Sequence, residues 1–339
     1  MRGKTKTWII TAAALVVVGA LIFVGAMTAV GWDFTGLGSS RYETNTYTLS
    51  ESFSDISAAV NTADVEFLPS EDATCRVVCY ERENGSYAAT VKDGKLTVSE
   101  KRERKWYESL FNFGHDKISV YLPSGAYSAL DIEVSTGDVS INGGLTFGDV
   151  VISVSTGEVR ITDTACQSLK SNGSTGYVYL KNLSVTGKVS VERSTGAITA
   201  LGLTTREVEL EATTGKIELS DSTALEKISL NVNTGKAVVS DVSCSAFKSE
   251  GDTGDIILKN TVVDGVLSIE RDTGDVKFER SDATEIFVET DTGSVTGTLL
   301  TDKIFISRSE TGRVDVPSGT VGGRCEITTD TGDIIISIN

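Results

Sequence analysis

Ser135-Thr136-Gly137 is the stretch of sequence that decides the fold, because this phrase or a close variant returns ten more times before the chain ends. The glycines that close the eleven phrases are Gly137, Gly157, Gly176, Gly196, Gly215, Gly235, Gly254, Gly274, Gly293, Gly312 and Gly332. Consecutive glycines lie 19 or 20 residues apart. Such a constant period indicates a repeat protein in which each unit packs on its neighbours.

The apolar residues keep one register relative to each glycine. In the unit of Gly215 they are Val208 and Leu210 before the glycine, and Ile217 and Leu219 after it. Each pair alternates with polar residues, which is typical of a strand with one buried face. The alternation changes parity across the glycine, so the glycine should form a corner, where it takes a positive φ at little cost.

Two short strands and a variable connector in each unit predict an all-β fold, a β-solenoid (β-helix) with coils of about 19–20 residues. Each strand should pair with its copies in the coils above and below. A β-propeller with two units per blade is the alternative. A blade needs different turns at its different corners, however, and here the same turn recurs in every unit. A longer repeat is also present, because the segment 166–173 returns as 244–251 and Arg193 returns as Arg271.

The chain before the repeats predicts a membrane anchor. Residues 1–8 form a basic tail, residues 9–31 a predicted transmembrane helix, residues 32–40 a linker, residues 41–130 an irregular N-terminal part of the solenoid, and residues 131–339 the regular repeats. No charged residue lies between Ile9 and Val30, a length that can cross a bilayer. The basic residues before it predict a single-pass protein of the cell membrane with a cytoplasmic N-terminus and an extracellular C-terminal domain. A cleaved signal peptide is the alternative.

Charge and cysteine content limit the classes of partner. The chain has 31 Lys and Arg against 47 Asp and Glu, a net charge of −16. Removing the three basic residues of the tail leaves 28 against 47, so the predicted extracellular part is near −19. This acidity disfavours nucleic acid as a partner. The five cysteines are spaced poorly for disulfides and are predicted to be buried apolar thiols.

Acidic residues at and after the later glycine corners predict a weak Ca²⁺ ladder. The candidate metal ligands are Asp252, Asp255, Asp272, Asp275, Asp291, Glu310, Asp330 and Asp333. Stacked carboxylates repel one another unless water or a hard cation lies between them. The alternative is a solvated column of turn residues that binds no metal. No other cofactor and no catalytic residue is predicted.

One segment, residues 101–116, breaks the β pattern and is a candidate contact site. Its basic and aromatic residues suit an anionic headgroup or a wall polymer. They are Lys101, Arg102, Arg104, Lys105, Trp106, Tyr107, Phe111 and Phe113. The alternative is a loop or short helix that covers an open end of the solenoid.

The N-terminal anchor, the segment Val120–Pro123 and the repeated [Ser/Asp]-Thr-Gly units resemble a family of bacterial membrane-anchored proteins labelled putative adhesins, which contain a β-solenoid domain of unknown function. The resemblance implies the fold and a place in the cell envelope, and it supplies no catalytic residues. We therefore expect a surface-displayed, non-enzymatic, adhesin-like binding protein whose partner is a cell-wall polymer or an envelope protein. The alternatives are a carbohydrate-active β-helix enzyme and a calcium-binding structural stalk. An enzyme should show a local cluster of carboxyl groups with displaced pKa values in a groove.

Overall fold

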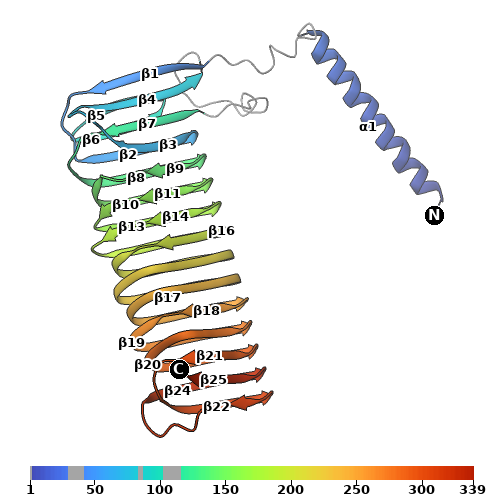
Figure 1. The fold of residues 1–339 in the computed structure, drawn as a ribbon. Helices are drawn as coiled ribbons and strands as arrows, with labels where there is room; N and C mark the ends of the chain where they lie inside the picture. The colour runs from blue at the N-terminus through green and yellow to red at the C-terminus, as the bar shows by residue number, and fades with distance from the viewer. Residues whose placement is uncertain (1, 30–41, 83–86, 102–115) are drawn as a thin grey trace.

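The fold is a single stack of β-strands, which a computed structural model describes for residues 2–29, 42–82, 87–101 and 116–339. Figure 1 shows the strands as successive rungs along one long axis. Neighbouring coils pair in parallel through most of the stack. The prediction of an all-β solenoid is therefore confirmed.

The only helix among the described residues is α1, Arg2–Ala29. Its described aliphatic side chains, such as Leu15 and Ile22, are exposed. In the described part of the chain no helix combines the length and the apolar character that crossing a membrane requires, so the predicted span at residues 9–31 is not supported. The predicted linker at residues 32–40 lies outside the described residues.

Each regular coil has three sides instead of the two that the sequence predicts. In one coil these sides are β10 (Thr146–Thr156), β11 (Val159–Thr162) and the short β12 (Ala165–Cys166). The sides stack in parallel on β8 (Ala126–Thr136) and β13 (Ser168–Thr175), on β9 (Val139–Ile141) and β14 (Val178–Lys181), and on β15 (Ser184–Val185). The predicted variable connector thus contains the third side.

The remaining strands continue this pattern toward the C-terminus. They are β16 (Lys188–Leu201), β17 (Thr204–Thr253), β18 (Ile256–Lys259), β19 (Val262–Thr273), β20 (Val276–Thr292), β21 (Val295–Leu299), β22 (Lys303–Thr311), β23 (Val314–Asp315), β24 (Gly323–Thr331) and β25 (Ile334–Ile338). Strands β16, β17 and β20 run through corners without a break, so β17 alone contributes to several coils.

The glycine corner is required by both conformation and space. Gly157 has a φ of 146°, and a Cβ built on it would lie 2.0 Å from the carbonyl oxygen of Gly137 in the previous coil. Glycine tolerates both conditions, whereas any side chain would clash. A second corner follows six residues later, where Asp163, Asn182 and Gly202 adopt the left-handed conformation. This second corner was missed, although Asp, Asn or Gly recurs there in successive units.

The interior is apolar and contains the cysteines. Inward residues such as Ile152 and Leu210 are almost fully buried. All five cysteines are buried free thiols, so the prediction of buried apolar thiols is confirmed. Two arginines, Arg193 and Arg271, are also buried in the core.

Both ends of the stack depart from sequence order, which corrects the expectation that coils stack strictly in the order of the chain. At the C-terminal end β24 pairs with both β20 and β22, so the last coil of the chain is inserted between its two predecessors. At the N-terminal end β2 (Asp55–Thr62) pairs with both β6 (Lys95–Glu100) and β8. Likewise β3 (Asp64–Pro69) lies between β7 (Lys117–Leu122) and β9.

The N-terminal end is finished by antiparallel strands. Here β1 (Tyr42–Leu49) pairs with β4 (Cys75–Arg82), β4 pairs with β7, and β5 (Tyr87–Lys92) pairs with β6. The turn at Asp93 and Gly94 joins β5 to β6, with both residues at positive φ. Part of residues 41–130 is therefore solenoid, and part is an antiparallel cover.

Candidate binding sites

The acidic residues two positions before the later glycines lie on the surface at one corner. Because the last coil is inserted, Asp330 lies between Asp291 and Glu310 in the stack. These three residues and Arg308 line a small pocket of about 190 Å³, in which Arg308 pairs with Glu310 at 3.1 Å. Over the described ranges, no group of three or more His, Cys, Asp or Glu residues is arranged to hold a metal ion. The Ca²⁺ ladder stays a prediction.

The acidic residues after the glycines have a role that the sequence reasoning did not foresee. One carboxylate oxygen of Asp275 accepts a hydrogen bond from the backbone N–H of Ser294 at 2.8 Å. In the same way Asp255 accepts from the backbone of Asp275 at 3.2 Å, and Asp333 accepts from that of Arg313 at 2.8 Å. These candidate metal ligands therefore join one coil to its neighbour in the stack.

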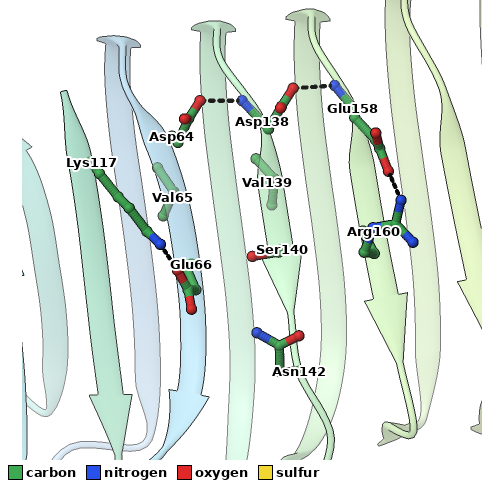
Figure 2. Close-up of a pocket in the computed structure, with 10 residues that line it drawn as sticks. All are labelled: Asp64, Val65, Glu66, Lys117, Asp138, Val139, Ser140, Asn142, Glu158 and Arg160. Atoms are coloured by element: carbon green, nitrogen blue, oxygen red, sulfur yellow. Dashed lines mark hydrogen bonds and ion pairs between the residues drawn. The ribbon is translucent and has the colours of Figure 1, made fainter. Parts of the chain in front are cut away.

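A surface pocket of about 360 Å³ occurs near the N-terminal end, at the corners of β3, β9 and β11 (Figure 2). It forms where the short Ser140 lies between Glu66 and Arg160 in one column of outward side chains. Its two basic groups are paired with two of its four acids: Lys117 contacts Glu66, and Arg160 contacts Glu158. The other two acids, Asp64 and Asp138, have no cationic partner among the described lining residues.

The pocket in Figure 2 repeats the coil-to-coil hydrogen bonds of the later corners. Asp64 accepts from the backbone N–H of Asp138 at 2.9 Å, and Asp138 accepts from that of Glu158 at 2.7 Å. These carboxylates are oriented along the stack by those bonds. We interpret the pocket as a by-product of the stacking.

Most of the candidate contact segment at residues 101–116 lies outside the described residues. Of its proposed contact residues only Lys101 is described, and its ammonium group donates to the Tyr47 hydroxyl at 2.8 Å. The same ammonium group lies 5.3 Å from the centre of the Tyr47 ring. The prediction for Arg102, Arg104, Lys105, Trp106, Tyr107, Phe111 and Phe113 remains untested.

A groove with a different chemistry runs along the third side of the coils. One part of about 460 Å³ is lined by the starts of β8 and β10, by β12 and by residues around β15. A second part of about 500 Å³ lies beside it toward the N-terminal end, and both parts share Ala126 and Tyr127. Hydroxyl side chains line both parts, among them Ser128, Thr146 and Thr186. Among the lining residues that the structure describes, Glu51 is the only Asp, Glu, Lys or Arg.

Aromatic rings form the floor of this groove. Phe53 stacks on Tyr127 with ring centres 5.8 Å apart, and Tyr127 lies 5.9 Å from Phe147 in the next coil. The Tyr127 hydroxyl donates to the carbonyl oxygen of Pro123 at 2.8 Å. Burial raises the pKa of Tyr127 to about 12, so the hydroxyl stays protonated at neutral pH. The floor is therefore rigid and uncharged.

Sequence reasoning missed the groove because it lies in the connectors, which have no strong alternation. The available signal was composition. Residues 124–128, 146–148 and 184–187 are rich in Ser, Thr and Gly and contain no charged residue.

The displaced carboxyl pKa values do not mark a catalytic group. At Glu209, Glu226 and Glu279 the pKa is lowered, first by a side-chain hydrogen bond from Lys188, Arg206 and Lys277 respectively. At Asp72 the pKa is lowered first by a hydrogen bond from the Thr74 hydroxyl. A general acid that works near neutral pH needs a shift in the opposite direction.

Comparison with solved structures finds several proteins that align over nearly their whole length, at low identity. A putative adhesin from Parabacteroides merdae is 15% identical with a TM-score of 0.47, over 78% of this chain and 98% of that one. A putative lipid binding protein from Parabacteroides distasonis is 16% identical with a TM-score of 0.41, over 85% and 96%. A putative adhesin from Bacteroides fragilis is 16% identical with a TM-score of 0.35, over 77% and 97%. No curated protein matches the sequence.

A family profile gives the clearer result. The profile described as Toastrack DUF4097 matches twice, at residues 53–188 and 182–337. The two matches together cover nearly the whole solenoid. They confirm the predicted membership of a family with unknown function, and the chain belongs to the Toastrack family, DUF4097.

Proposed function

We propose that this protein is a non-enzymatic binding protein of the cell envelope, and that its third-side groove holds an uncharged, hydroxyl-rich polymer such as a neutral polysaccharide. The single observation that carries the proposal is a hydroxyl-lined groove that has one charged residue, Glu51, among its described lining residues, on a chain with a net charge of −16.

The chemistry of the lining favours a neutral glycan over a charged one. Serine and threonine hydroxyls both donate and accept hydrogen bonds, which matches the hydroxyl groups of sugars. The overall negative charge of the chain repels acidic polymers. A cationic ligand would need carboxylates in the groove, and Glu51 is the only one there.

The rigidity of the site also favours binding. The lining residues lie at the starts of stacked strands, and the Phe53, Tyr127 and Phe147 rings hold adjacent coils together. A ligand chain that follows the stack would thus meet a preformed surface, which lowers the entropic cost of binding.

Display outside the cell is the second part of the proposal, and it rests on the sequence alone. The uncharged run of residues 9–30 after a basic tail is the pattern of an uncleaved anchor. A protease added to intact cells should then remove the solenoid and leave a fragment near residue 40. Full protection of a tag fused after Asn339 would contradict this topology.

The binding function can be tested with immobilised neutral glucan and mannan, and with an acidic wall polymer as comparison. The protein should be retained by a neutral polymer and not by the acidic one. Thr146→Glu with Thr186→Glu, which places two charges in the groove, should weaken retention at least tenfold. The matched control is Thr195→Glu with Thr214→Glu, which places the same charges on exposed threonines of adjacent coils at the glycine corner, away from the third side. Equal losses in both variants, or retention only by the acidic polymer, would refute the proposal.

A further inference from the structure

The C-terminal end of the solenoid finishes in an unpaired strand edge. Figure 1 shows β22 at the end of the stack. Among the described strands β22 pairs only with β24, and β23 pairs only with β25. The nine residues of β22 therefore leave a row of backbone N–H and C=O groups without a strand partner. Such an edge is a template for pairing with another strand, and proteins usually protect it.

Most of the surface around this edge lacks the usual protection, and only its start is covered, by the chain at Gly319, which lies against Lys303. Exposed aliphatic side chains gather in the last two coils, at Ile304, Ile306, Val314, Val321 and Ile335. Inside β22, Phe305 is only partly buried against the core. Proline, which often blocks an edge, is absent from β22.

The charge of the terminal coil permits association between like chains. Residues 302–315 contain three basic residues, Lys303, Arg308 and Arg313. They also contain three acidic residues, Asp302, Glu310 and Asp315, so this coil has no net charge in an acidic chain. Two copies can thus meet end to end at this coil without the repulsion that their other surfaces would impose.

An orphaned hydroxyl lies at the centre of the edge. The Oγ atom of Ser307 is buried from solvent and has no hydrogen-bond partner. Ser307 is the fifth of the nine residues from Lys303 to Thr311, so it is the midpoint of β22. Buried polar atoms without a partner are rare, and each calls for an explanation.

A second β22 fits this edge in an antiparallel arrangement about a two-fold axis at Ser307. In that register Ser307 faces its own copy, Phe305 faces Ser309, and Ile306 faces Arg308. Residues of the inward face meet residues of the inward face, so the two cores become continuous. The two serine hydroxyls face each other across the strands and can hydrogen-bond. One patch used twice is the geometry of a closed two-fold dimer.

We propose that the protein forms a two-fold dimer, end to end, through antiparallel pairing of β22 with β22 of a second copy. The two-fold axis passes through the contact at Ser307. The contact gives hydrogen-bond partners to the backbone groups of the open edge and to the Ser307 hydroxyl. Dimerisation is independent of the proposed polysaccharide binding, because the groove lies at the opposite end of the solenoid.

The test is disulfide trapping of the full chain, since the native cysteines are buried. Ser307→Cys should yield a covalent dimer on mild oxidation, seen on a non-reducing gel. Ser309→Cys is the register control, because in the proposed pairing Ser309 does not face its own copy and should remain monomeric on the gel. A far-ultraviolet spectrum equal to that of the parent establishes that each variant is folded.

A second measurement uses the parent cysteines only. Sedimentation of the full chain should give a dimer, and Ile304→Lys with Ile306→Lys should weaken association at least tenfold by placing charges along the contact. Loss of dimer in this variant also excludes association through α1. A parent that stays monomeric at all concentrations, an undiminished dimer in the lysine variant, or trapping at Ser309 in place of Ser307 would each overturn the proposal.

Discussion

The middle of the solenoid and its C-terminal end bury cations in two different ways. In the middle, Arg271 reaches beside Gly251 of the adjacent coil and donates to the Ser249 hydroxyl at 2.6 Å. No ion pair involving this guanidinium occurs among the described residues, and burial lowers its pKa to about 10. At the end, Lys303 is buried and forms an ion pair with Asp282 at 2.7 Å.

The two cations differ in whether they determine which coils become neighbours in the stack. The neighbours of a middle coil are fixed by the continuity of the chain, so Arg271 need not select them. Its side chain fills the space beside Gly251 and donates to the Ser249 hydroxyl and the Val232 carbonyl oxygen. Lys303, on β22, instead lies next to Gly323 of the inserted coil. Its ion pair with Asp282 joins β22 to β20, which lies on the far side of the inserted coil. We interpret the ion pair as the contact that selects the inserted order over the sequential one, a specificity role that buried polar pairs can have.

The largest effect is expected for Asp282→Ala. It leaves the Lys303 ammonium buried without a carboxylate, which should lower the free energy of unfolding by about 3–5 kcal/mol. The midpoint of urea unfolding measures the change. Replacing both partners by apolar residues, Asp282→Leu with Lys303→Met, should restore most of the stability. A single variant as stable as the parent would show that the ion pair does not hold the end together.

A smaller effect is expected for Gly251→Ala in the middle. The new Cβ would lie 1.8 Å from a guanidinium nitrogen of Arg271 and 2.0 Å from the carbonyl oxygen of Val232, so the coils must shift. Overpacking of this kind costs about 1–3 kcal/mol. The matched control is Gly125→Ala, where nothing lies within 4 Å of the built Cβ, and which should change the urea midpoint little. Equal losses in the two variants would contradict the packing argument.

Arg271→Met should change stability by less than about 1.5 kcal/mol, because it removes a buried charge while keeping much of the side-chain volume. Thermal unfolding of this variant beside Asp282→Ala sharpens the comparison. If Arg271→Met lowered the stability as much as Asp282→Ala, the two buried cations would contribute equally to stability. The interpretation that they have different roles would then be wrong.

The sequence predicts the middle of this molecule far better than its ends. Alternation about glycines such as Gly157 and Gly215 predicts the strands, the buried faces and the corner, because each depends on residues close in the chain. Insertion of β24 between β20 and β22 leaves the glycine period unchanged, so no periodic signal can reveal it. The order there depends on contacts between distant residues, among them Lys303 and Asp282.

The candidate sites divide in the same way. Asp275 and Asp333 could be recognised as acids at repeated corners, but their hydrogen bonds to the next coil depend on backbone positions that the stacking creates. The groove depends on short side chains in connectors that carry no alternation. The acidic residues of the predicted Ca²⁺ ladder could therefore be found from their repeated position in the sequence. The groove was indicated only by the Ser, Thr and Gly content of its connectors.

The smallest effect is expected for alkylation of the native thiols in the folded protein. This measurement compares Cys166 at the groove with Cys325 at the C-terminal end. Burial raises the pKa of both thiols to about 12 from an ordinary value near 9. Because the thiolate is the reactive form, an alkylating reagent at pH 8 should label neither in the folded protein, and all five cysteines in urea. The raised thiol pKa values also link the stability of the fold to pH. Their contribution to the free energy of unfolding is fully present below pH 9, where the thiols are protonated in both states. It is lost as the pH rises toward 12, because the unfolded thiols ionise first. Labelling followed by peptide mass spectrometry gives the rate at each cysteine. Faster labelling of Cys325 than of Cys166 would show that the C-terminal end opens more readily than the groove region, even with its ion pair intact.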